Sequence, residues 1–424
     1  MPKIKRLTAR QLIDCKCRPM VEVDIETDDG HWGRGSSPTG SSVGHFEAAV
    51  IRDGDPREYD GQGVHQAVAN VTKLIAPALI GRDVMDQRGA DQVMLELDGT
   101  PDKSKLGGNA IYSVSIACLR AAAACRNIPV YQHILGREPR TVPVPSFNIV
   151  NGGHYGDTVL AFNEFLVVPY GAASIAEAVE IGVKSLAGLG KILRRHLGHE
   201  PMVGKSYGWA APSDDPDRVL GLMQELLVDN GWEGRVAFAL DCASSEMFDR
   251  DSATYLLKGR RIKAEELIAY ARELSEKYPL VFIEDLLDED DWENYPKAVK
   301  AIPRSLIIGD DLTVTNLSRI RRAYESQAVE GFILKPNQVG SITEALDAHA
   351  YAKENGMVAI PSGRAGGVVD DVVMDFSVGL EVPLQKNGAP RSGERITKLN
   401  FLMRAADLSP GCRMFDLSQM LRFK

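Results

Sequence analysis

The sequence lacks the features that would place the chain in a membrane, outside the cell or on nucleic acid. No stretch approaches the roughly 18 consecutive apolar residues that a membrane-spanning helix needs. The N-terminal residues MPKIKRLTAR contain no apolar segment of the kind found in secretory signals. An excess of positive charge is also missing, because the formal net charge is -9. We therefore expect a cytoplasmic protein whose main partner is neither a membrane nor a nucleic acid.

Cysteine and histidine are too few and too scattered to suggest a disulfide scaffold or a soft-metal site. The six cysteines form no CxxC pair and do not reach the density of a secreted disulfide-rich protein. None of the eight histidines lies beyond His349. No histidine is therefore expected to serve the C-terminal strand ends.

The composition is that of an ordinary globular chain, with 44% hydrophobic and 25% charged residues. A length of 424 residues is sufficient for two domains. The segments KIKRLTARQLID, PMVEVDIET and HWGRGSS, with the turn DDG, predict an antiparallel meander. Helical spacing follows over residues 63–80 and 109–127, and the stretch PRTVPVPS then marks a boundary. We predict an N-terminal α+β domain.

Beyond this boundary, strand-like and helix-like segments alternate, which is typical of a parallel (β/α)8 barrel. The predicted helices have apolar residues at helical spacing and cover residues 174–196, 215–231, 264–278, 317–327 and 341–356.

Charged residues stand where the strand-like runs of this region end. The runs VAFALD, LVFIED, LIIGDD and GFILK lead to Asp241, Glu284, Asp310 and Lys335, and Lys386 lies further along. Asp, Glu and Lys are rarely buried unless they are paired or bound to a cation. Because the carboxyl ends of barrel strands meet on one face, these side chains predict one site with a hard divalent metal beside an amine base.

The chain resembles the enolase family over nearly its whole length. The matching segments occur in the family's order and at close to its spacing; they are LDGTPDKSKLGGNAIYSVSIACLRAAAA, PVPSFNIVNGG, LDCASSEMFD, IEDLLDEDDW, IGDDLTVTN, LKPNQVGS and GAPRSGER. The resemblance implies an α/β fold with an enolase-like α+β capping domain at residues 1–138 and an enolase-like modified (β/α)8 catalytic barrel at residues 143–424. It also implies a homodimer or a higher homo-oligomer.

The resemblance assigns a metal site to the strand ends. Asp241, Glu284 and Asp310 match the family's ligands for a first Mg²⁺, and oxygen ligands suit this ion. Ser42, in TGSSVG, matches the serine of a loop that joins a second metal. The loop otherwise differs from the family, so the second site is the weaker prediction.

Three further residues match catalytic positions of the family. Lys335 matches the general base, Lys386 matches the lysine that contacts the substrate carboxylate, and Glu164 matches an active-site glutamate. Removing a proton next to a carboxylate requires neutralisation of the charge that develops there, which Mg²⁺ and Lys386 would supply. We expect neighbouring cations to lower the pKa of Lys335 so that it can accept the proton.

Arg364 matches the phosphate-binding arginine of the family. A guanidinium group suits a phosphate or phosphonate oxyanion through paired hydrogen bonds. Judged without the resemblance, Arg364 would be read first as part of a surface or structural ion pair.

The chain departs from the family within the same pocket. The family's GDEGGF segment reads GKSYGW here, so that Lys205 replaces an aspartate and Ser206 replaces the glutamate that assists loss of hydroxide. General-acid assistance typically contributes about 10²- to 10⁴-fold, so this change should depress dehydration of 2-phosphoglycerate. Lys205 could instead meet extra negative charge on a substrate.

Other departures affect histidine and serine positions. The histidine of NGGSHAG falls on Tyr155, with His154 one place early, while Gly363 replaces the histidine of SHRSG and Ala365 the serine after Arg364. The residue that replaces the missing acid stays open among Lys205, Ser206, Tyr207 and Tyr155.

We therefore predict a Mg²⁺-dependent lyase or synthase acting next to the carboxylate of a small anionic glycerate or enolpyruvate that carries phosphate or phosphonate. A carboxyphosphonoenolpyruvate synthase is one candidate. The alternatives are an ordinary enolase and a non-catalytic binding protein with the enolase fold.

Overall fold

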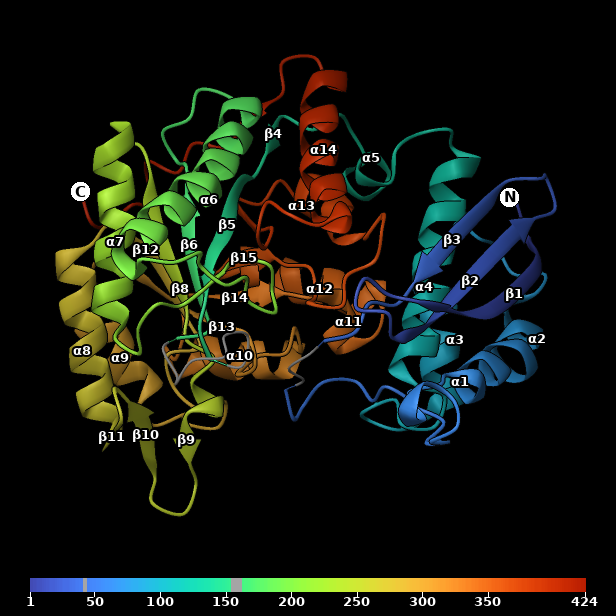
Figure 1. Ribbon diagram of the computed structural model, residues 1–424. Helices are drawn as coiled ribbons and strands as arrows, with labels where there is room; N and C mark the ends of the chain where they lie inside the picture. Colours follow the sequence, from blue (N-terminus) through green and yellow to red (C-terminus); the bar gives the residue numbers. More distant parts are fainter. Residues whose placement is uncertain (41–43, 154–161) are drawn as a thin grey trace.

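The computed structural model of the chain describes residues 1–40, 44–153 and 162–424. The N-terminal elements lie beside a large curled sheet that is surrounded by helices (Figure 1). Backbone hydrogen bonds join the two parts, including one from Thr39 to Gly366 and one from Ala48 to Gln338. Residues from the N-terminal part thus reach the edge of the barrel.

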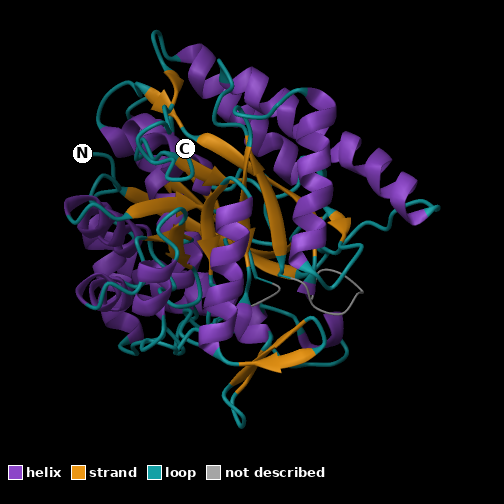
Figure 2. Ribbon diagram, turned by 90° about the vertical axis from the view of Figure 1, so that its left-hand side faces the viewer, coloured by secondary structure: helices purple, strands orange, loops and turns teal. Residues whose placement is uncertain are grey.

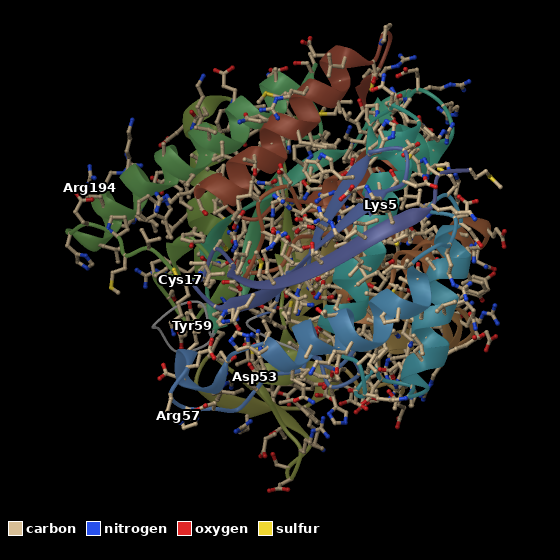
Figure 3. The ribbon with its side chains drawn as sticks, turned by 90° about the vertical axis from the view of Figure 1, so that its right-hand side faces the viewer. Lys5, Cys17, Asp53, Arg57, Tyr59 and Arg194 are labelled. Atoms are coloured by element: carbon tan, nitrogen blue, oxygen red, sulfur yellow. The ribbon has the colours of Figure 1, made fainter. Side chains whose placement is uncertain are left out.

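The predicted antiparallel meander is confirmed. It consists of β1 (Ile4–Ile13), β2 (Pro19–Thr27) and β3 (Trp32–Ser36), paired in this order. Figure 3 faces this sheet, in which β1 runs across the view between the labelled Lys5 and the turn that contains Cys17. The helical elements that follow are α1 (His65–Asn70), a π-helical turn (Val71–Ile75), α2 (Ala76–Leu79), α3 (Gln87–Asp98), α4 (Gly108–Cys125) and α5 (Val130–Leu135). The sequence did not lead us to expect α3.

Helix α4 packs unusually close to β3. An ideal Cβ on Gly35 would lie 2.0 Å from the carbonyl oxygen of Ser113, and one on Gly33 would lie 2.2 Å from the amide of Ala121. Only glycine permits this approach of a strand to a helix backbone. The small residues of α4, which looked like a generic helix signal in the sequence, therefore serve close packing.

The barrel is a nine-stranded sheet in the described part of the chain, with the order β15–β14–β13–β12–β8–β6–β5–β16 and with β7 paired to β5. A bridge between Ser362, which follows β15, and Lys386 brings the two ends of this order together. The strands are β5 (Val144–Asn151), β6 (Glu164–Val168), β7 (Trp209–Ala210), β8 (Ala237–Asp241), β12 (Leu280–Glu284), β13 (Leu306–Gly309), β14 (Gly331–Leu334), β15 (Val358–Pro361) and β16 (Leu384–Lys386).

One strand breaks the all-parallel pattern that the sequence suggested. β6 runs antiparallel to both β5 and β8. No described helix separates β5 from β6, so the chain reverses direction instead of crossing over the sheet. As a result the first residue of β6, Glu164, lies at the same rim as the last residues of the parallel strands.

Helices surround the barrel strands (Figure 2). The five predicted barrel helices are confirmed as α6, α7, α8, α10 and α12, and four of them start with the side-chain caps Ser174, Asp215, Asn316 and Ser341. The barrel helices are α6 (Ile175–Leu197), α7 (Pro216–Asn230), α8 (Ala264–Lys277), α9 (Tyr295–Ala301), α10 (Leu317–Glu325), α11 (Pro336–Val339), α12 (Ile342–Glu354), α13 (Val373–Gly379) and α14 (Gly393–Leu408).

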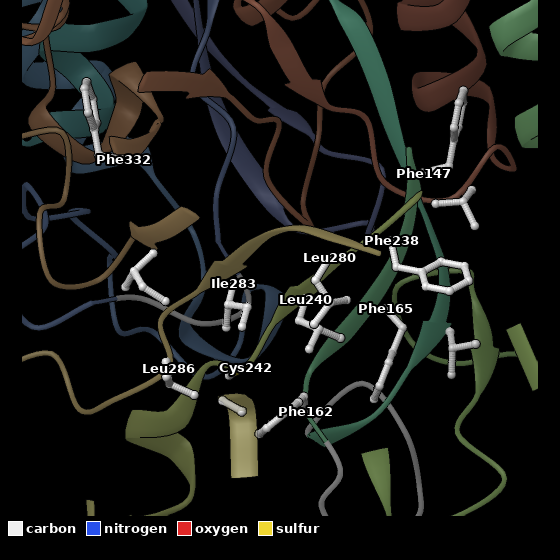
Figure 4. Packing of buried hydrophobic residues seen from close by; sticks show 14 of the residues in the cluster. Phe147, Phe162, Phe165, Phe238, Leu240, Cys242, Leu280, Ile283, Leu286 and Phe332 are labelled. Carbon is white, nitrogen blue, oxygen red and sulfur yellow. The ribbon is translucent and has the colours of Figure 1, made fainter. Parts of the chain in front are cut away.

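The barrel strands are buried on both faces, which explains their continuous apolar runs. Phe238 and Leu240 of β8 pack outward against the helices, in the cluster shown in Figure 4. Ala237 and Ala239 of the same strand instead join a cluster to which most other barrel strands also contribute. Alternate residues thus fill the barrel interior and the layer below the helices.

Smaller elements complete the fold. β9 (Phe248–Asp249), β10 (Thr254–Leu257) and β11 (Arg260–Ile262) form a hairpin-like sheet that projects from the barrel (Figure 1). β4 (Thr141–Val142) pairs with β17 (Arg413–Met414). Among the described residues, every helix is either too short or too polar to cross a membrane.

Candidate active site

The charged residues that end the barrel strands line one cavity. Asp241 and Lys386 are the last residues of β8 and β16, and Asp310 and Lys335 directly follow β13 and β14. Glu164 reaches the same cavity as the first residue of the antiparallel β6. Side chains that are far apart in sequence therefore meet because of the strand directions alone.

Strand register brings three of the carboxylates side by side. Asp241 is the direct partner of Glu284 on one neighbouring strand and of Glu164 on the other. All three carboxylates are buried. Such a row of buried carboxylates requires positive charge nearby.

Lys386 supplies part of that charge. Its Nζ donates hydrogen bonds to Asp241 Oδ2 at 2.7 Å and to Glu284 Oε2 at 2.7 Å, and it lies 3.2 Å from Glu164 Oε2. Burial by itself would lower the pKa of Lys386, but the three carboxylates raise this pKa well above its ordinary value. Lys386 is therefore held as a cation at the centre of the cavity floor.

Lys335 is paired with the neighbouring strand end. Its Nζ donates to Asp310 Oδ2, and Gln338 Nε2 donates to Asp310 Oδ1 at 2.9 Å. We expected a lowered pKa for Lys335, which is wrong for this arrangement. Burial, Arg364 and Lys386 do lower the pKa of Lys335, but contact with Asp310 outweighs them and raises it.

A second layer of acids supports these strand ends. Asp285 Oδ1 and Oδ2 accept hydrogen bonds from the backbone amides of Asp310 and Asp311 at 2.8 and 2.9 Å. Ligand atoms of Asp285, Asp310 and Asp311 all lie within 4.8 Å of one another. Sequence analysis assigned no role to Asp285 or Asp311, although both are part of the strand-end runs IED and GDD.

The donor set fits a hard divalent cation. Several carboxylates line the cavity, and carboxylate oxygens are the ligands that such an ion prefers. Burial and the neighbouring Asp241 raise the pKa of Glu284 well above its ordinary value, which is the behaviour of an acid that lacks sufficient counter-charge. Asp241, Glu284 and Asp310 could thus hold Mg²⁺, with Asp285 orienting the backbone of Asp310.

Arg364 lies in the cavity lining and is buried. Its Nη1 and Nη2 donate to Glu47 Oε2 and Oε1 at 2.7 and 3.0 Å. Burial lowers the pKa of Arg364, but Glu47 raises it above its ordinary value. The ion pair that we considered as an alternative is therefore present, and it holds the guanidinium group at the cavity.

The altered positions also lie at the cavity. Ser206 is buried, donates a hydrogen bond to Glu164 Oε1 at 3.3 Å and lines the cavity together with Gly363 and Ala365. The side chain of Lys205 is exposed. Ser42, His154 and Tyr155 fall outside the described residues.

Sequence reasoning also missed polar residues of the lining that come from α14 and from the end of β16. Arg395 and Lys398 come from α14, and Asn387 follows Lys386. Arg395 ends the segment GAPRSGER, but we had assigned it no function. The available signal was the group of charged residues Glu394, Arg395 and Lys398 within the first turns of a helix, where charges are normally solvated.

Comparisons with known proteins identify the family. Residues 4–134 match the family model described as "Enolase, N-terminal domain", and residues 139–411 match "Enolase, C-terminal TIM barrel domain". A protein named "Enolase" from Methanopyrus kandleri is 39% identical over 419 residues, which cover 98% of each chain. Another of that name, from Methanococcus maripaludis, is 39% identical over 402 residues, or 95% of this chain and 94% of its own.

These matches confirm the predicted α/β fold, with an N-terminal enolase domain and a C-terminal barrel. The chain belongs to the enolase family, whose members are magnesium-dependent hydro-lyases.

Proposed function

We propose that this enzyme removes the proton next to the carboxylate of a small phosphorylated substrate, with Lys335 as the general base. The observation that carries the proposal is the convergence of Lys335, Lys386, Asp241 and Asp310 on one cavity, with Glu284 bonded to Lys386. A plain structural core would not need two lysines, one of them buried, and three buried carboxylates at the ends of its strands.

The two lysines would divide the work. Lys386 is held as a cation by its carboxylate neighbours, so it can neutralise charge on the substrate carboxylate. Lys335 would take the proton at Nζ after giving up its contact with Asp310, and Arg364 and Lys386 favour its uncharged form. Mg²⁺ held by Asp241, Glu284 and Asp310 would supply further positive charge at the substrate carboxylate.

The relatives favour the ordinary enolase reaction, the dehydration of 2-phosphoglycerate to phosphoenolpyruvate. Both are named "Enolase" and align over nearly the whole chain. Arg364 would bind the substrate phosphate in this reading, exchanging Glu47 for phosphate oxygens.

A second candidate is a related reaction on a more anionic substrate, such as the one of carboxyphosphonoenolpyruvate synthase. Neither matched family model nor either relative names a phosphonate enzyme. The support comes from the cavity, where Ser206 stands in place of the family's acid and Gly363 in place of its histidine. Loss of hydroxide would then lack its usual proton donor.

One assay separates the candidates. Purified protein with Mg²⁺ and 2-phosphoglycerate is followed for phosphoenolpyruvate formation and for exchange of the α-hydrogen with deuterium from D₂O. Rapid elimination with exchange identifies an ordinary enolase. Exchange without elimination supports the altered substrate, and absence of both overturns proton abstraction from 2-phosphoglycerate.

The non-catalytic alternative has its own test. A binding protein without metal chemistry should show no saturable heat when Mg²⁺ is titrated in the presence of phosphoenolpyruvate, whereas the proposed lyase should. We also propose domain limits at 1–138 and 143–424, which limited proteolysis would test. We propose a homodimer, which sedimentation would test, and a cytoplasmic location, which cell fractionation would test.

A further inference from the structure

We propose that Arg395 and Lys398 form a second anion subsite of the active-site cavity, which binds a carboxylate, phosphate or phosphonate group in addition to the phosphate and carboxylate of the main substrate. This inference rests on the proposed function, because it adds a group to the substrate that Lys335 and Lys386 would bind. The substrates bound in the cavity would then carry three anionic groups: a carboxylate and a phosphate, as in 2-phosphoglycerate, and one further anion.

Lys398 is the main evidence. Lys398 is only 3% exposed, and it lines the cavity together with Gly363. Its Nζ makes no hydrogen bond with any residue in the described ranges, and its one ion-pair contact there is to Glu394 Oε2 at 3.8 Å. A buried ammonium group without a hydrogen bond is costly, so its presence at a cavity indicates a missing acceptor.

Glycine at position 363 makes room for this ammonium group. An ideal Cβ on Gly363 would lie 2.5 Å from Lys398 Nζ, closer than any real contact of a methyl group. A side chain here would push Nζ away from the lining. Gly363, which stands in place of the family's histidine, therefore leaves the space that Lys398 Nζ occupies.

Arg395 provides the second cation. Arg395 is 3% exposed. Its Nη1 and Nη2 donate to the carbonyl oxygen and to Oγ of Ser206 at 2.5 and 3.1 Å. Its Nε donates to Glu394 Oε1 at 3.1 Å. These contacts leave part of the guanidinium donor set unused among the described residues, at the position where the family's acid is replaced.

The charges around this pair are not balanced by hydrogen bonds. Glu394 touches both cations, but its Oε2 has no hydrogen-bond partner within the described chain, and the same holds for Asp371 Oδ2 near Gly363. Burial raises the pKa of Asp371, against the opposing effect of Lys398, which weakens this carboxyl as a counter-ion. A purely structural ion-pair network would close these contacts.

Asn387 adds a polar group to the subsite. It lines the same cavity, and both Nδ2 and Oδ1 of its side chain are buried without a hydrogen-bond partner among the residues that are described. An amide that loses both of its hydrogen bonds on folding is expected to find them with a ligand. Arg395, Lys398 and Asn387 together present donors suited to the oxygens of an anion.

The test is calorimetry on the full-length protein with Mg²⁺. Phosphoenolpyruvate is titrated first as the probe of the main site, and inorganic phosphate or malonate is then titrated into the protein saturated with phosphoenolpyruvate. The two anions distinguish a subsite for a tetrahedral group from one for a carboxylate. We expect one of them to bind saturably without displacing phosphoenolpyruvate.

Three variants locate the subsite. Lys398→Met should weaken the second anion by about 10- to 100-fold, because it removes a charge-assisted hydrogen bond. Gly363→Ala should weaken the second anion as well, because its Cβ would displace Lys398 Nζ. Gly221→Ala is the matched control, because its Cβ would meet only Tyr278 Oη at 3.6 Å. Unfolding curves confirm that each variant is folded.

Displacement of phosphoenolpyruvate by the second anion, or equal binding in all variants, would overturn the subsite. Failure of phosphoenolpyruvate to bind would instead remove the proposed function. In that case phosphate and malonate are titrated into the free protein, and anion binding that Lys398→Met does not weaken would overturn the subsite as well.

Discussion

Two walls of the active-site cavity differ in how they are built and in how far they follow the family. The strand-end wall is made by Asp241, Asp310, Lys335 and Lys386, and Glu284 is bonded to Lys386. It retains the residues that the resemblance assigns to the first metal and to proton abstraction. The loop-and-helix wall, made by Ser206, Gly363, Arg395 and Lys398, contains two departures and two cations to which sequence analysis had assigned no role.

The difference follows from what holds each wall in place. Register pairs such as Asp241 with Glu284 fix the strand-end wall, and the buried charges there depend on one another. The residues of the loop-and-helix wall are held by individual side-chain contacts, such as Arg395 to Ser206. A family can therefore change this wall, and with it the substrate or the leaving group, while keeping the proton-abstraction chemistry.

The largest effect should come from the strand-end wall. Replacing Lys335 by alanine removes the proposed base, so exchange of the substrate α-hydrogen should fall by about 10²- to 10⁴-fold. Deuterium exchange in 2-phosphoglycerate, followed by NMR, measures this loss. Lys191→Ala, at an exposed lysine of α6, is the control and should exchange normally. Undiminished exchange in Lys335→Ala would remove Lys335 as the base.

A smaller effect is expected at Arg364, which lies at the same cavity. Lysine cannot reproduce the two hydrogen bonds of the guanidinium group, so Arg364→Lys should bind phosphoenolpyruvate about tenfold more weakly. Calorimetry in the presence of Mg²⁺ measures the affinity. The outcome against this role would be unchanged affinity in Arg364→Lys together with a loss of thermal stability, because Arg364 would then act only as the ion-pair partner of Glu47.

A single substitution in the loop-and-helix wall should not restore the ordinary enolase activity. Ser206→Glu restores the acid of the family, but the new carboxylate would meet Arg395 and Glu164, and Gly363 and Ala365 would still differ. We expect dehydration of 2-phosphoglycerate to rise by less than about tenfold, which is below the range of about 10²- to 10⁴-fold for general-acid assistance. A coupled assay of phosphoenolpyruvate formation decides this. A rise of several orders of magnitude would mean that the replacement of the family's glutamate by Ser206 is alone responsible for the low dehydration activity.

The smallest effect concerns a buried acid near the loop-and-helix wall. Asp375 lines a surface cavity together with Lys398, and burial raises the pKa of Asp375 to about 7 despite the opposing effect of Arg120. The folded protein keeps this carboxyl protonated at pH values where the unfolded chain loses the proton. Its contribution to stability is thus present at low pH and is lost as the pH rises from the unfolded pKa towards 7.

In consequence, Asp375→Asn should flatten the pH dependence of stability. The difference in slope should be at most about 1.4 kcal/mol per pH unit between pH 5 and pH 7. Urea unfolding at several pH values measures it, with the exposed Asp407→Asn as the control. If Asp375→Asn and the original protein show parallel pH profiles, the carboxyl ionises normally in the fold.

Much of the fold could be predicted from local patterns. The meander β1–β3 has strand composition and clear turns, and α6, α7, α8, α10 and α12 each have a complete apolar face. Helix α3 was missed, and the direction of β6 could not be foreseen because antiparallel pairing leaves no mark within a short buried strand.

The sequence by itself determined the chemical content of the site. Acids and lysines at the ends of buried strands have to be paired or bound to a cation, so Asp241, Glu284, Asp310, Lys335 and Lys386 could be identified without coordinates. Only the tertiary structure decided how their charges compete. Distances set electrostatic interactions, and the contact of Lys335 with Asp310 raises a pKa that neighbouring cations alone would lower. Likewise, only the packing of α14 against the cavity shows that Arg395 and Lys398 enter the space left by Ser206 and Gly363, because no local pattern records which distant residue fills a gap.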